Sequence, residues 1–315
     1  MRISVLIPSW RRPDDLMRCL AALDAQSQPP QEVLVVIREG DELTRIALEQ
    51  AGSDAFALRA VHVSVPGAVA ALRAGLSEAS GEVIAVTDDD AAPRRDWLEG
   101  MEAHYRLDAS VGAVGGPDRL RDRCEPTYDP ATVVGKVRWF GRVMGNHHLG
   151  AGAARPVHVL KGVNLSVRRA ALEDRWLDDR LQGDGAQVHW ELALCLALKR
   201  AGWKLVYDPA AAVDHHPAPR FGEDQRGHRS LRALEDEVHN ETYALVRWLP
   251  TWQKPLALAY GLLVGSRKAP GLLSFVRQLP RARDRRVLAR RLLAAQRARL
   301  SGLASAWQNR AGPSD

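Results

Sequence analysis

Short apolar runs alternate with helical patterns over the first third of the chain. Runs of aliphatic and β-branched residues predict strands at 3–7, 32–37, 60–65 and 83–86. Apolar residues at helical spacing, with charged or small residues between them, predict helices from 14 to the residues before Pro29, at 42–50 and at 68–79. This alternation, with short connections, predicts parallel strands joined by right-handed crossovers. The carboxyl ends of the strands then meet at one edge of the sheet, where ligands bind in open α/β folds.

Three consecutive acids stand where the fourth of these strands leaves the sheet. Asp88, Asp89 and Asp90 repel one another, and near a sheet edge this costs on the order of a few kcal/mol unless a cation compensates it. Hard oxygen ligands select Mg²⁺ or Mn²⁺, which complete their shells with substrate phosphates. The alternative is a solvated turn in which Asp90 caps a helix that starts near Pro93.

The first strand is expected to end at Pro8, because proline cannot continue a central ladder. The turn that follows is 9–13, and it lies at the same edge of the sheet as the three acids. No glycine fingerprint of the dinucleotide or P-loop type follows this strand, so neither of those sites is supported.

The motifs at these two turns resemble those of family 2 glycosyltransferases. The first turn, Pro8-Ser9-Trp10-Arg11-Arg12-Pro13, is similar to the family's Pro-Thr-Tyr-Asn-Arg-Pro, and Ala79-Ser80-Gly81-Glu82 leads into the acids as it does in the family. The resemblance implies the GT-A fold, an α/β architecture with a Rossmann-like, mixed but mostly parallel sheet flanked by helices. It also implies a nucleotide-sugar lying across both turns, in contact with Pro8, Ser9, Arg12, Asp88 and Asp89.

Two departures from the family concern the nucleotide. The acid that ends the family's second strand is replaced by Ile37-Arg38-Glu39-Gly40-Asp41, which leaves Glu39 or Asp41 as its substitute. The family's Ala-Arg-Asn-x-Gly reads Ala71-Leu72-Arg73-Ala74-Gly75, which makes Arg73 a candidate donor contact. Both changes leave the base of the nucleotide open.

The second half of the resemblance supplies the remaining site residues. Residues 160–170 resemble the family's Gly-Gly-Asn-x-x-x-Arg-Arg, which implies that Gly162 and Asn164 wall the sugar pocket; an ordinary helix start is the alternative. Residues 194–202 align with the family's Leu-Cys-Leu-Arg-x-Arg-Arg-Ala-Gly and put Glu191 in the place of the general base. Asp184 is the fallback base, and the alternative for Glu191 is an acid that stabilises the start of a helix.

A histidine after the closing strand, 205–207, completes the implied metal site. In the family such a histidine reaches the metal or the diphosphate, and His215 matches better than His216. Asp88, Asp90 and His215 are therefore expected to hold Mg²⁺ or Mn²⁺, with Asp89 on the ribose or behind the ligands. Residues 119–157 are expected to be irregular, either an acceptor loop or disorder, and His147 is expected to be solvated there.

Charge is concentrated in the C-terminal region. Residues 253–315 hold 13 Lys and Arg against 2 Asp, a net charge of +11, whereas residues 1–252 hold −5. A basic segment from 281 to 300, with Leu288, Leu292, Leu293 and Leu300 expected on one helical face, follows a 12-residue apolar stretch at 255–266 that is too short to span a bilayer. This pattern favours peripheral attachment to an anionic membrane. A nucleic-acid-binding arm is the rival, but interleaved aromatic residues are missing.

The remaining composition indicates a cytoplasmic globular protein. Three widely spaced cysteines, Cys19, Cys124 and Cys195, are typical of a reducing compartment and of packing roles, and the first apolar run is too short for a secretory signal. We expect a glycosyltransferase domain at 1–217, with a nucleotide-binding half at 1–110 and an acceptor half at 111–217, and a helical basic region at 218–315.

The activity implied is metal-dependent, inverting transfer from a nucleotide-sugar to a hydroxyl of a saccharide or lipid-linked saccharide, in the synthesis of cell-surface polysaccharide or glycolipid. Two other classes stay open at this point. An inactive sugar-nucleotide-binding scaffold would explain Glu191 at the base position and Ala197 in place of an arginine. A nucleic-acid-binding protein would explain only the tail.

Overall fold

The computed structural model describes residues 1–120, 131–172, 177–219 and 230–308, and Cys124 lies outside them. The chain forms two compact units. The first consists of residues 1–136, 144–176 and 201–218, and the second of 137–143, 177–200 and 219–315. The first unit ends close to the predicted boundary at 217, but two inner segments, 137–143 and 177–200, belong to the second unit. Glu191 and Asp184 lie in one of these segments.

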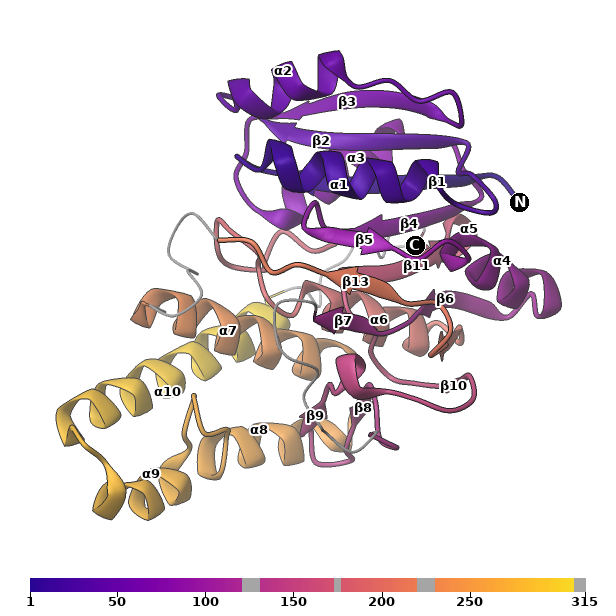
Figure 1. Ribbon diagram of the computed structural model, residues 1–315. Coiled ribbons are helices and arrows are strands. Elements are labelled where there is room, and N and C mark those ends of the chain that lie inside the picture. The colour runs from indigo at the N-terminus through magenta and orange to yellow at the C-terminus, as the bar shows by residue number, and fades with distance from the viewer. Residues whose placement is uncertain (121–130, 173–176, 220–229, 309–315) are drawn as a thin grey trace. The chain divides into compact units, whose positions relative to one another are not determined.

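An eight-stranded sheet forms the core of the first unit (Figure 1). Its order is β10 (Arg155–Pro156), β12 (Lys204–Tyr207), β6 (Val111–Gly115), β11 (Asn164–Arg168), β4 (Val83–Thr87), β1 (Ile3–Ser9), β2 (Glu32–Arg38) and β3 (Ala57–Val63). The pairs β4–β1, β1–β2, β2–β3 and β6–β12 are parallel, and β10 and β11 run antiparallel to their neighbours. This is the mixed, mostly parallel sheet that the sequence predicts.

The first strand is longer than expected. Pro8 and Ser9 still pair with Val36 and Ile37 of β2, so the expectation of a turn at Pro8 is wrong. The pairing of β1 with β4 ends earlier, at Leu6. Proline is tolerated here because only one side of β1 has a neighbouring strand at this point.

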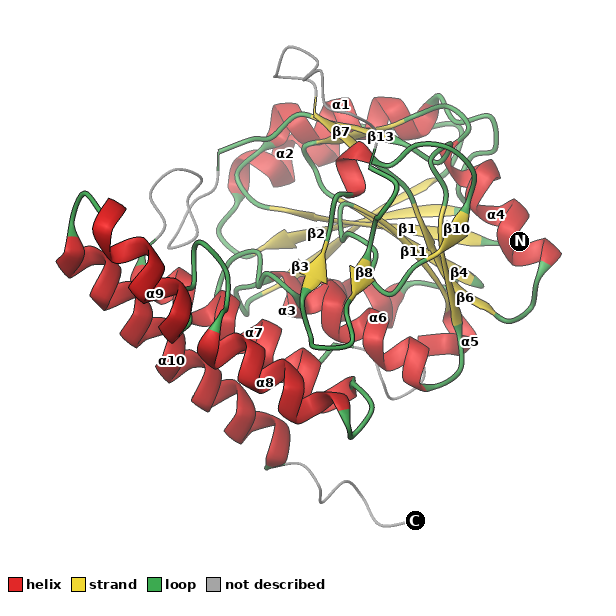
Figure 2. Ribbon diagram, turned by 90° about the horizontal axis from the view of Figure 1, so that it is seen from below, coloured by secondary structure: helices red, strands yellow, loops and turns green. Residues whose placement is uncertain are grey.

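Helices cover both faces of this sheet. They are α1 (Pro13–Asp24), α2 (Glu42–Gln50), α3 (Ala68–Glu78), α4 (Trp97–Leu107) and the single turn α5 (Arg169–Leu172). Figures 1 and 2 show α1 and α3 on opposite faces. Helix α1 buries Leu16, Cys19, Leu20 and Leu23, the face that the sequence predicts. The glycine Gly75 lets α3 approach the sheet closely, since a Cβ there would stand 2.9 Å from Val36 Cγ2.

A three-stranded sheet stands beside the carboxyl edge of the large one. Strand β13 (Val213–His215) lies between β5 (Ala91–Pro93) and β7 (Asp118–Leu120). The short elements β8 (Lys136–Val137), β9 (Val143–Met144) and η1 (His147–Leu149) lie in the stretch expected to be irregular. The expectation that His147 is solvated is wrong: it is 6% exposed, and its Nε2 lies 3.0 Å from the carbonyl oxygen of Val159. Burial lowers the pKa of His147.

Helices make up the described part of the second unit almost entirely. They are α6 (Trp190–Arg200), α7 (Leu231–Trp248), α8 (Gln253–Leu263), α9 (Leu272–Gln278), the short η3 (Leu279–Arg281) and α10 (Arg285–Trp307). Helix α7 contacts α6, α8 and α10, and Figure 2 shows α7 to α10 side by side. Gly302 of α10 lets the two longest helices approach closely, since a Cβ there would stand 2.6 Å from the carbonyl oxygen of His239. None of the described helices has both the length and the apolar character needed to cross a bilayer.

The buried face of α10 differs from the predicted one. Leu288 and Leu292 are buried, but Leu293 and Leu300 are each 57% exposed, so the prediction of one common leucine face is wrong. The buried stripe instead continues from Leu292 through Ala295, Arg299, Gly302 and Ala306. These residues follow a three-and-four spacing, and the small ones among them let α10 lie close against α7.

Candidate active site

The structure brings together the three predicted metal ligands. Asp88, Asp90 and His215 each offer one ligand atom, and these atoms lie within 4.8 Å of one another. The two sheets explain the arrangement: the acids follow β4, β5 follows the acids, and β13 pairs with β5 so that His215 stands opposite Ala91. Asp90 does not cap a helix, because β5 follows it and α4 begins after Asp96. Two carboxylates and an imidazole suit Mg²⁺ or Mn²⁺.

Burial makes the electrostatics of this group strong. Asp90 is 1% and His215 5% exposed, and His215 Nε2 lies 3.2 Å from Asp90 Oδ1. Burial by itself lowers the pKa of His215, but the neighbouring carboxylates outweigh it and raise the pKa to about 9. Burial likewise favours a higher pKa for Asp90, yet His215 and a backbone N–H lower it to about 2. An imidazolium therefore balances part of the acidic charge when no metal ion is bound.

Asp118 is a member of this cluster that the sequence analysis missed. It is 1% exposed on β7, its Oδ2 lies 3.6 Å from His215 Nδ1, and it forms an ion pair with Lys161. Burial opposes the ionised form, but His215 and Lys161 lower the pKa of Asp118 to about 2. A carboxylate on the second nitrogen of a ligating histidine fixes the orientation of its ring. The sequence did hold one signal for Asp118. It stands just after strand β6, as Asp88 stands just after β4.

Asp89 ties the first turn to the acidic turn. It is 2% exposed; Ser9 Oγ donates to Oδ2 at 2.9 Å, and Arg12 Nη1 donates to Oδ1 at 2.9 Å. Arg12 also lies 3.7 Å from Asp90 Oδ2. Burial raises the pKa of Asp89 to about 7, against the opposing effect of Arg12. Ser9, Arg12 and Asp89 thus meet next to the predicted metal ligand Asp90. Contact of Asp89 with a ribose stays a prediction.

Asp41, one of the two acids predicted to touch the nucleotide, holds the backbone of the first turn. Arg11 has a left-handed φ of 57°, and its N–H donates to the Asp41 carboxylate. The other oxygen of Asp41 accepts from Thr44 N at 3.2 Å and so caps α2. Glu39 is exposed beyond β2, and Arg73 is exposed on α3. Contact of these residues with the donor stays a prediction.

An aromatic ring at the same turn was not considered in the sequence analysis. The guanidinium carbons of Arg11 and Arg38 each lie 4.8 Å from the Trp10 ring centroid. Cations stack on an indole face through its quadrupole. A tryptophan next to two arginines at the end of a strand was the available signal.

Asn164 is built into the fold. It is fully buried; its Nδ2 donates to the carbonyl oxygens of Pro117 at 3.0 Å and Ala211 at 2.8 Å, and its Oδ1 accepts from Trp97 Nε1 at 2.8 Å. These bonds connect β11, α4 and the segments that lead into β7 and β13. Gly162 is buried nearby in sequence. A contact of Gly162 or Asn164 with a sugar stays a prediction.

The two candidate bases belong to the second unit. Glu191 stands in the first turn of α6 and is half-buried, and Asp184 is exposed in the segment before it. That segment has an unusual backbone, with left-handed φ values of 107° at Gly183, 43° at Gln187 and 78° at His189. Non-glycine residues in this region carry strain, and such strain is found at functional sites.

A buried side chain of α7 holds this segment in place. Asn240 Oδ1 accepts from Gln182 N at 2.7 Å, and its Nδ2 donates to the carbonyl oxygens of Gln182 at 3.0 Å and Val188 at 3.1 Å. The backbone that leads to Glu191 is therefore fixed at both ends of its strained part.

Comparison with known proteins identifies a family and several relatives. A sequence model described as Glycosyltransferase like family 2 matches residues 1–230. Glycosyltransferase AglE of Haloferax volcanii is 27% identical over 228 residues, 70% of this chain and 68% of that protein. The glucosyl-dolichyl phosphate glucuronosyltransferase of the same organism is 24% identical over 225 residues, 68% of this chain and 69% of that protein.

Solved structures share the fold. The mannosyltransferase PcManGT from Pyrobaculum calidifontis, in complex with GDP-Man and Mn²⁺, has a TM-score of 0.55 at 20% identity, covering 98% of this chain and 88% of that one. The predicted GT-A architecture and the predicted enzyme class, a glycosyltransferase, are confirmed. The chain belongs to the glycosyltransferase like family 2.

Proposed function

We propose that the chain transfers a sugar from a nucleotide-diphospho-sugar to an acceptor hydroxyl with inversion at the anomeric carbon. The observation that carries the proposal is the group formed by Asp88, Asp90 and His215 at the carboxyl edge of the sheet. A buried arrangement of two carboxylates and an imidazole suits a divalent cation, and the acids directly follow a parallel strand, where the phosphates of a ligand bind in α/β folds.

Asp88, Asp90 and His215 would hold Mg²⁺ or Mn²⁺. When bound, the ion neutralises the charge that develops on the leaving diphosphate. Asp118 and Lys161 keep the His215 ring oriented, and Arg12 with Ser9 fixes Asp89 behind the ligands. The similar mannosyltransferase is bound to GDP-Man and Mn²⁺, which supports a nucleotide-sugar and a divalent ion at this site.

Glu191 is the proposed general base. Its carboxylate takes the proton of the acceptor hydroxyl, and the oxygen forms a bond to the anomeric carbon as the bond to the diphosphate oxygen breaks on the opposite side. The support is its alignment with the base of the family and the strained, Asn240-held backbone before α6. Asp184 lies in the same held segment and is the alternative base.

We further propose that the second unit attaches to the anionic, cytoplasmic face of a cell membrane, where the acceptor is a lipid-linked saccharide. Residues 253–315 carry a net charge of +11. Exposed apolar side chains stand on α8 and α9, with Leu272, Leu273 and Val276 at 51%, 61% and 63% exposure. Each Lys or Arg near such a surface contributes about 1 kcal/mol. One similar protein is named for an acceptor of this kind, glucosyl-dolichyl phosphate.

Donor binding tests the metal site directly. A panel of nucleotide-sugars should raise the melting temperature of the purified protein, and the increase should depend on Mn²⁺ or Mg²⁺. Asp90→Ala should abolish the metal-dependent part while the protein stays folded. Asp14→Ala, which removes an exposed acid of α1, is the matched control and should behave as wild type. Donor affinity that is unchanged by EDTA, or metal-dependent binding that survives Asp90→Ala, would contradict the assignment.

Vesicle cosedimentation tests the membrane proposal separately. Replacing Leu272, Leu273 and Val276 by Ser should move the protein from anionic vesicles to the supernatant, because their apolar area no longer enters the interface. Leu293→Ser with Leu300→Ser removes exposed leucines of α10 and is the control. Equal sedimentation of wild type and the α9 variant would remove the membrane proposal and leave the transfer reaction untouched.

A further inference from the structure

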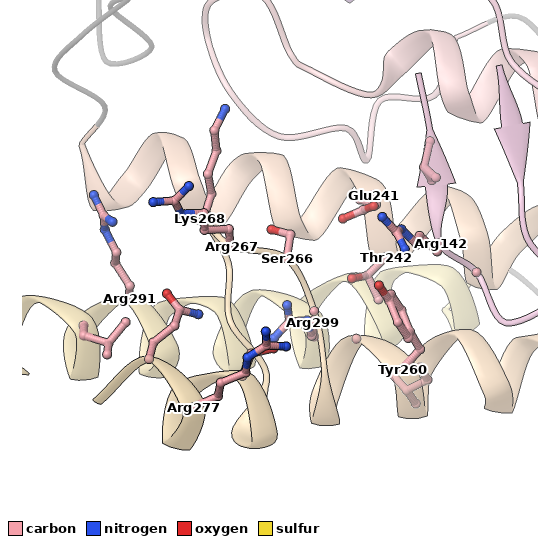
Figure 3. A pocket seen from close by; sticks show the side chains of 18 of the residues that line it. Arg142, Glu241, Thr242, Tyr260, Ser266, Arg267, Lys268, Arg277, Arg291 and Arg299 are labelled. Atoms are coloured by element: carbon pink, nitrogen blue, oxygen red, sulfur yellow. The ribbon is translucent and has the colours of Figure 1, made fainter. Parts of the chain in front are cut away.

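A large cationic cavity lies within the second unit (Figure 3). Its volume is about 1310 Å³, and α7, α8, α9, α10, η3 and residues 141–143 line it. Its charged lining residues are Arg142, Arg267, Lys268, Arg277, Arg281, Arg283, Arg291 and Arg299, with only Glu241 and Asp284 of opposite sign. The predicted metal ligands all lie in the first unit, so the cavity is a separate feature of the chain.

Five of the eight cations have no carboxylate partner among the described residues. Within the described ranges, no Asp or Glu oxygen lies within 4.0 Å of the cationic nitrogens of Arg267, Lys268, Arg277, Arg281 or Arg291. Asp284 is engaged elsewhere, because its carboxylate accepts from the N–H groups of Arg286 at 2.8 Å and Val287 at 3.2 Å and so caps α10. A concave surface with one sign of charge concentrates ligands of the other sign.

The basic turn at the rim of the cavity is rigidly built. Arg299 of α10 is 4% exposed, and its guanidinium donates to the carbonyl oxygens of Ala269 at 2.7 Å and Pro270 at 3.2 Å. Gly265 has a φ of 63°, and a Cβ there would stand 2.6 Å from Arg299 Nη2, so only glycine leaves room for this clamp. Ser266 Oγ accepts from Ala269 N at 3.0 Å and closes the turn. Arg267 and Lys268 are thereby presented from a fixed backbone.

We propose that this cavity binds the phosphate or diphosphate headgroup of a membrane lipid. Arginine forks match phosphate oxygens in pairs, and the hydroxyls of Ser266 and Tyr260 add neutral donors to the lining. Pockets for drug-sized ligands measure roughly 300–1,000 Å³. A cavity of 1310 Å³ exceeds what a bare phosphate fills and leaves room for a diphosphate with an attached sugar.

The faces of α8 and α9 argue for a lipid as the source of the phosphate. On α9, Ser274, Arg277 and Gln278 line the cavity, whereas Leu272, Leu273 and Val276 occupy the other side of the helix and are exposed. On α8, Ala257, Tyr260 and Gly261 line the cavity, whereas Trp252, Leu256 and Leu263 follow one exposed stripe. An apolar outer face beside a cationic cavity fits the boundary between acyl chains and headgroups. This lipid inference rests on the proposed membrane attachment.

The test compares two charge-matched double variants of the full chain. Arg277→Gln with Arg291→Gln removes two cations that line the cavity, and Arg290→Gln with Arg297→Gln removes two exposed cations of α10 that do not. Binding is measured to phosphatidylcholine vesicles containing phosphatidic acid, a phosphomonoester, and to vesicles of equal charge containing phosphatidylglycerol. Soluble pyrophosphate is tested alone by thermal shift and titration calorimetry.

Wild type should prefer the phosphatidic acid vesicles, and the cavity variant should lose about tenfold or more of that affinity while the control variant keeps the preference. Wild type could instead bind both kinds of vesicle with equal affinity and bind pyrophosphate through Arg277 and Arg291. That result would overturn the lipid as the source of the phosphate and leave a site for free phosphate. Loss of the preference in both variants alike, or no response to any phosphate, would overturn the site. Metal-dependent donor binding is unaffected in every case, so failure here is distinct from failure of the proposed transferase reaction.

Discussion

Replacing Asn164 should lower the stability of the fold more than it weakens donor binding. Asn164→Ala leaves two buried groups without partners, the carbonyl oxygen of Ala211 and the Nε1–H of Trp97, whereas the carbonyl oxygen of Pro117 still accepts from the N–H of Val213 at 3.0 Å. Each unsatisfied buried group costs about 1 to 3 kcal/mol, so the loss should be at least about 2 kcal/mol, against a total of about 5 to 15 kcal/mol for a native protein. Guanidinium denaturation followed by tryptophan fluorescence measures this loss.

A double-mutant cycle isolates one of the three bonds. Trp97→Phe removes the donor to Asn164 Oδ1 together with part of the indole ring, and the cost of the lost ring is common to both backgrounds. The substitution should therefore cost about 1 to 3 kcal/mol more in the wild type than once Asn164 is already Ala. Donor affinity, measured well below the melting temperature, should change by no more than a few-fold in Asn164→Ala. If that variant instead loses less than about 1 kcal/mol of stability and about tenfold or more in donor affinity, the amide serves the sugar and this reasoning fails.

Three further predictions concern single residues. Glu191→Gln should lower transfer at least about 10²-fold with donor affinity within a few-fold, measured by steady-state kinetics; if Asp184→Asn is the crippling change, Asp184 is the base. Arg12→Gln removes the cation beside the buried Asp89. Because the pKa of Asp89 is already about 7, its carboxyl can take up a proton, so the variant should cost about 1 to 3 kcal/mol in denaturation experiments near pH 7, and a loss under about 1 kcal/mol would contradict the ion pair's role. Because burial lowers the pKa of His147 below its usual 6.5, the unfolded chain binds a proton that the folded chain does not, so the unfolding free energy falls as pH drops below about 6.5. His147→Gln should flatten that slope between about pH 5 and 7, and an unchanged slope would refute it.

The places of Asp88 and Asp90 were predictable because they follow from the order of elements. Asp88 and Asp90 come directly after a buried strand, and a parallel sheet collects such strand ends at one edge. His215 was added by resemblance, and the structure explains its place through the pairing of β13 with β5. The link is local in the sequence: Asp90, a predicted ligand, is followed directly by Ala91, the residue of β5 that pairs with His215.

Roles that depend on distant pairings were not predictable. Asp118 meets His215 because β7 joins β13 on the side opposite β5, and nothing in either segment indicates that partner. Asn164 has the polarity of a sugar ligand, and the sequence does not indicate that its amide also bonds to Trp97 and to two backbone carbonyls of other segments. The buried face of α10 was mispredicted for a similar reason. Its stripe is set by Gly302 and small residues that fit α7, while two leucines remain exposed.

Helix α7 gives the second unit an internal connection that the linear sequence hides. His239 Nε2 lies 3.1 Å from the carbonyl oxygen of Arg180, and its Nδ1 lies 3.1 Å from Ser301 Oγ of α10. The next residue, Asn240, holds the strained segment before Glu191, and Glu241 beyond it lines the cationic cavity. Three consecutive residues of α7, namely His239, Asn240 and Glu241, thus contact the segment before Glu191, helix α10 and the cavity. The segment before Glu191, helix α10 and the cavity therefore share α7 as a common support.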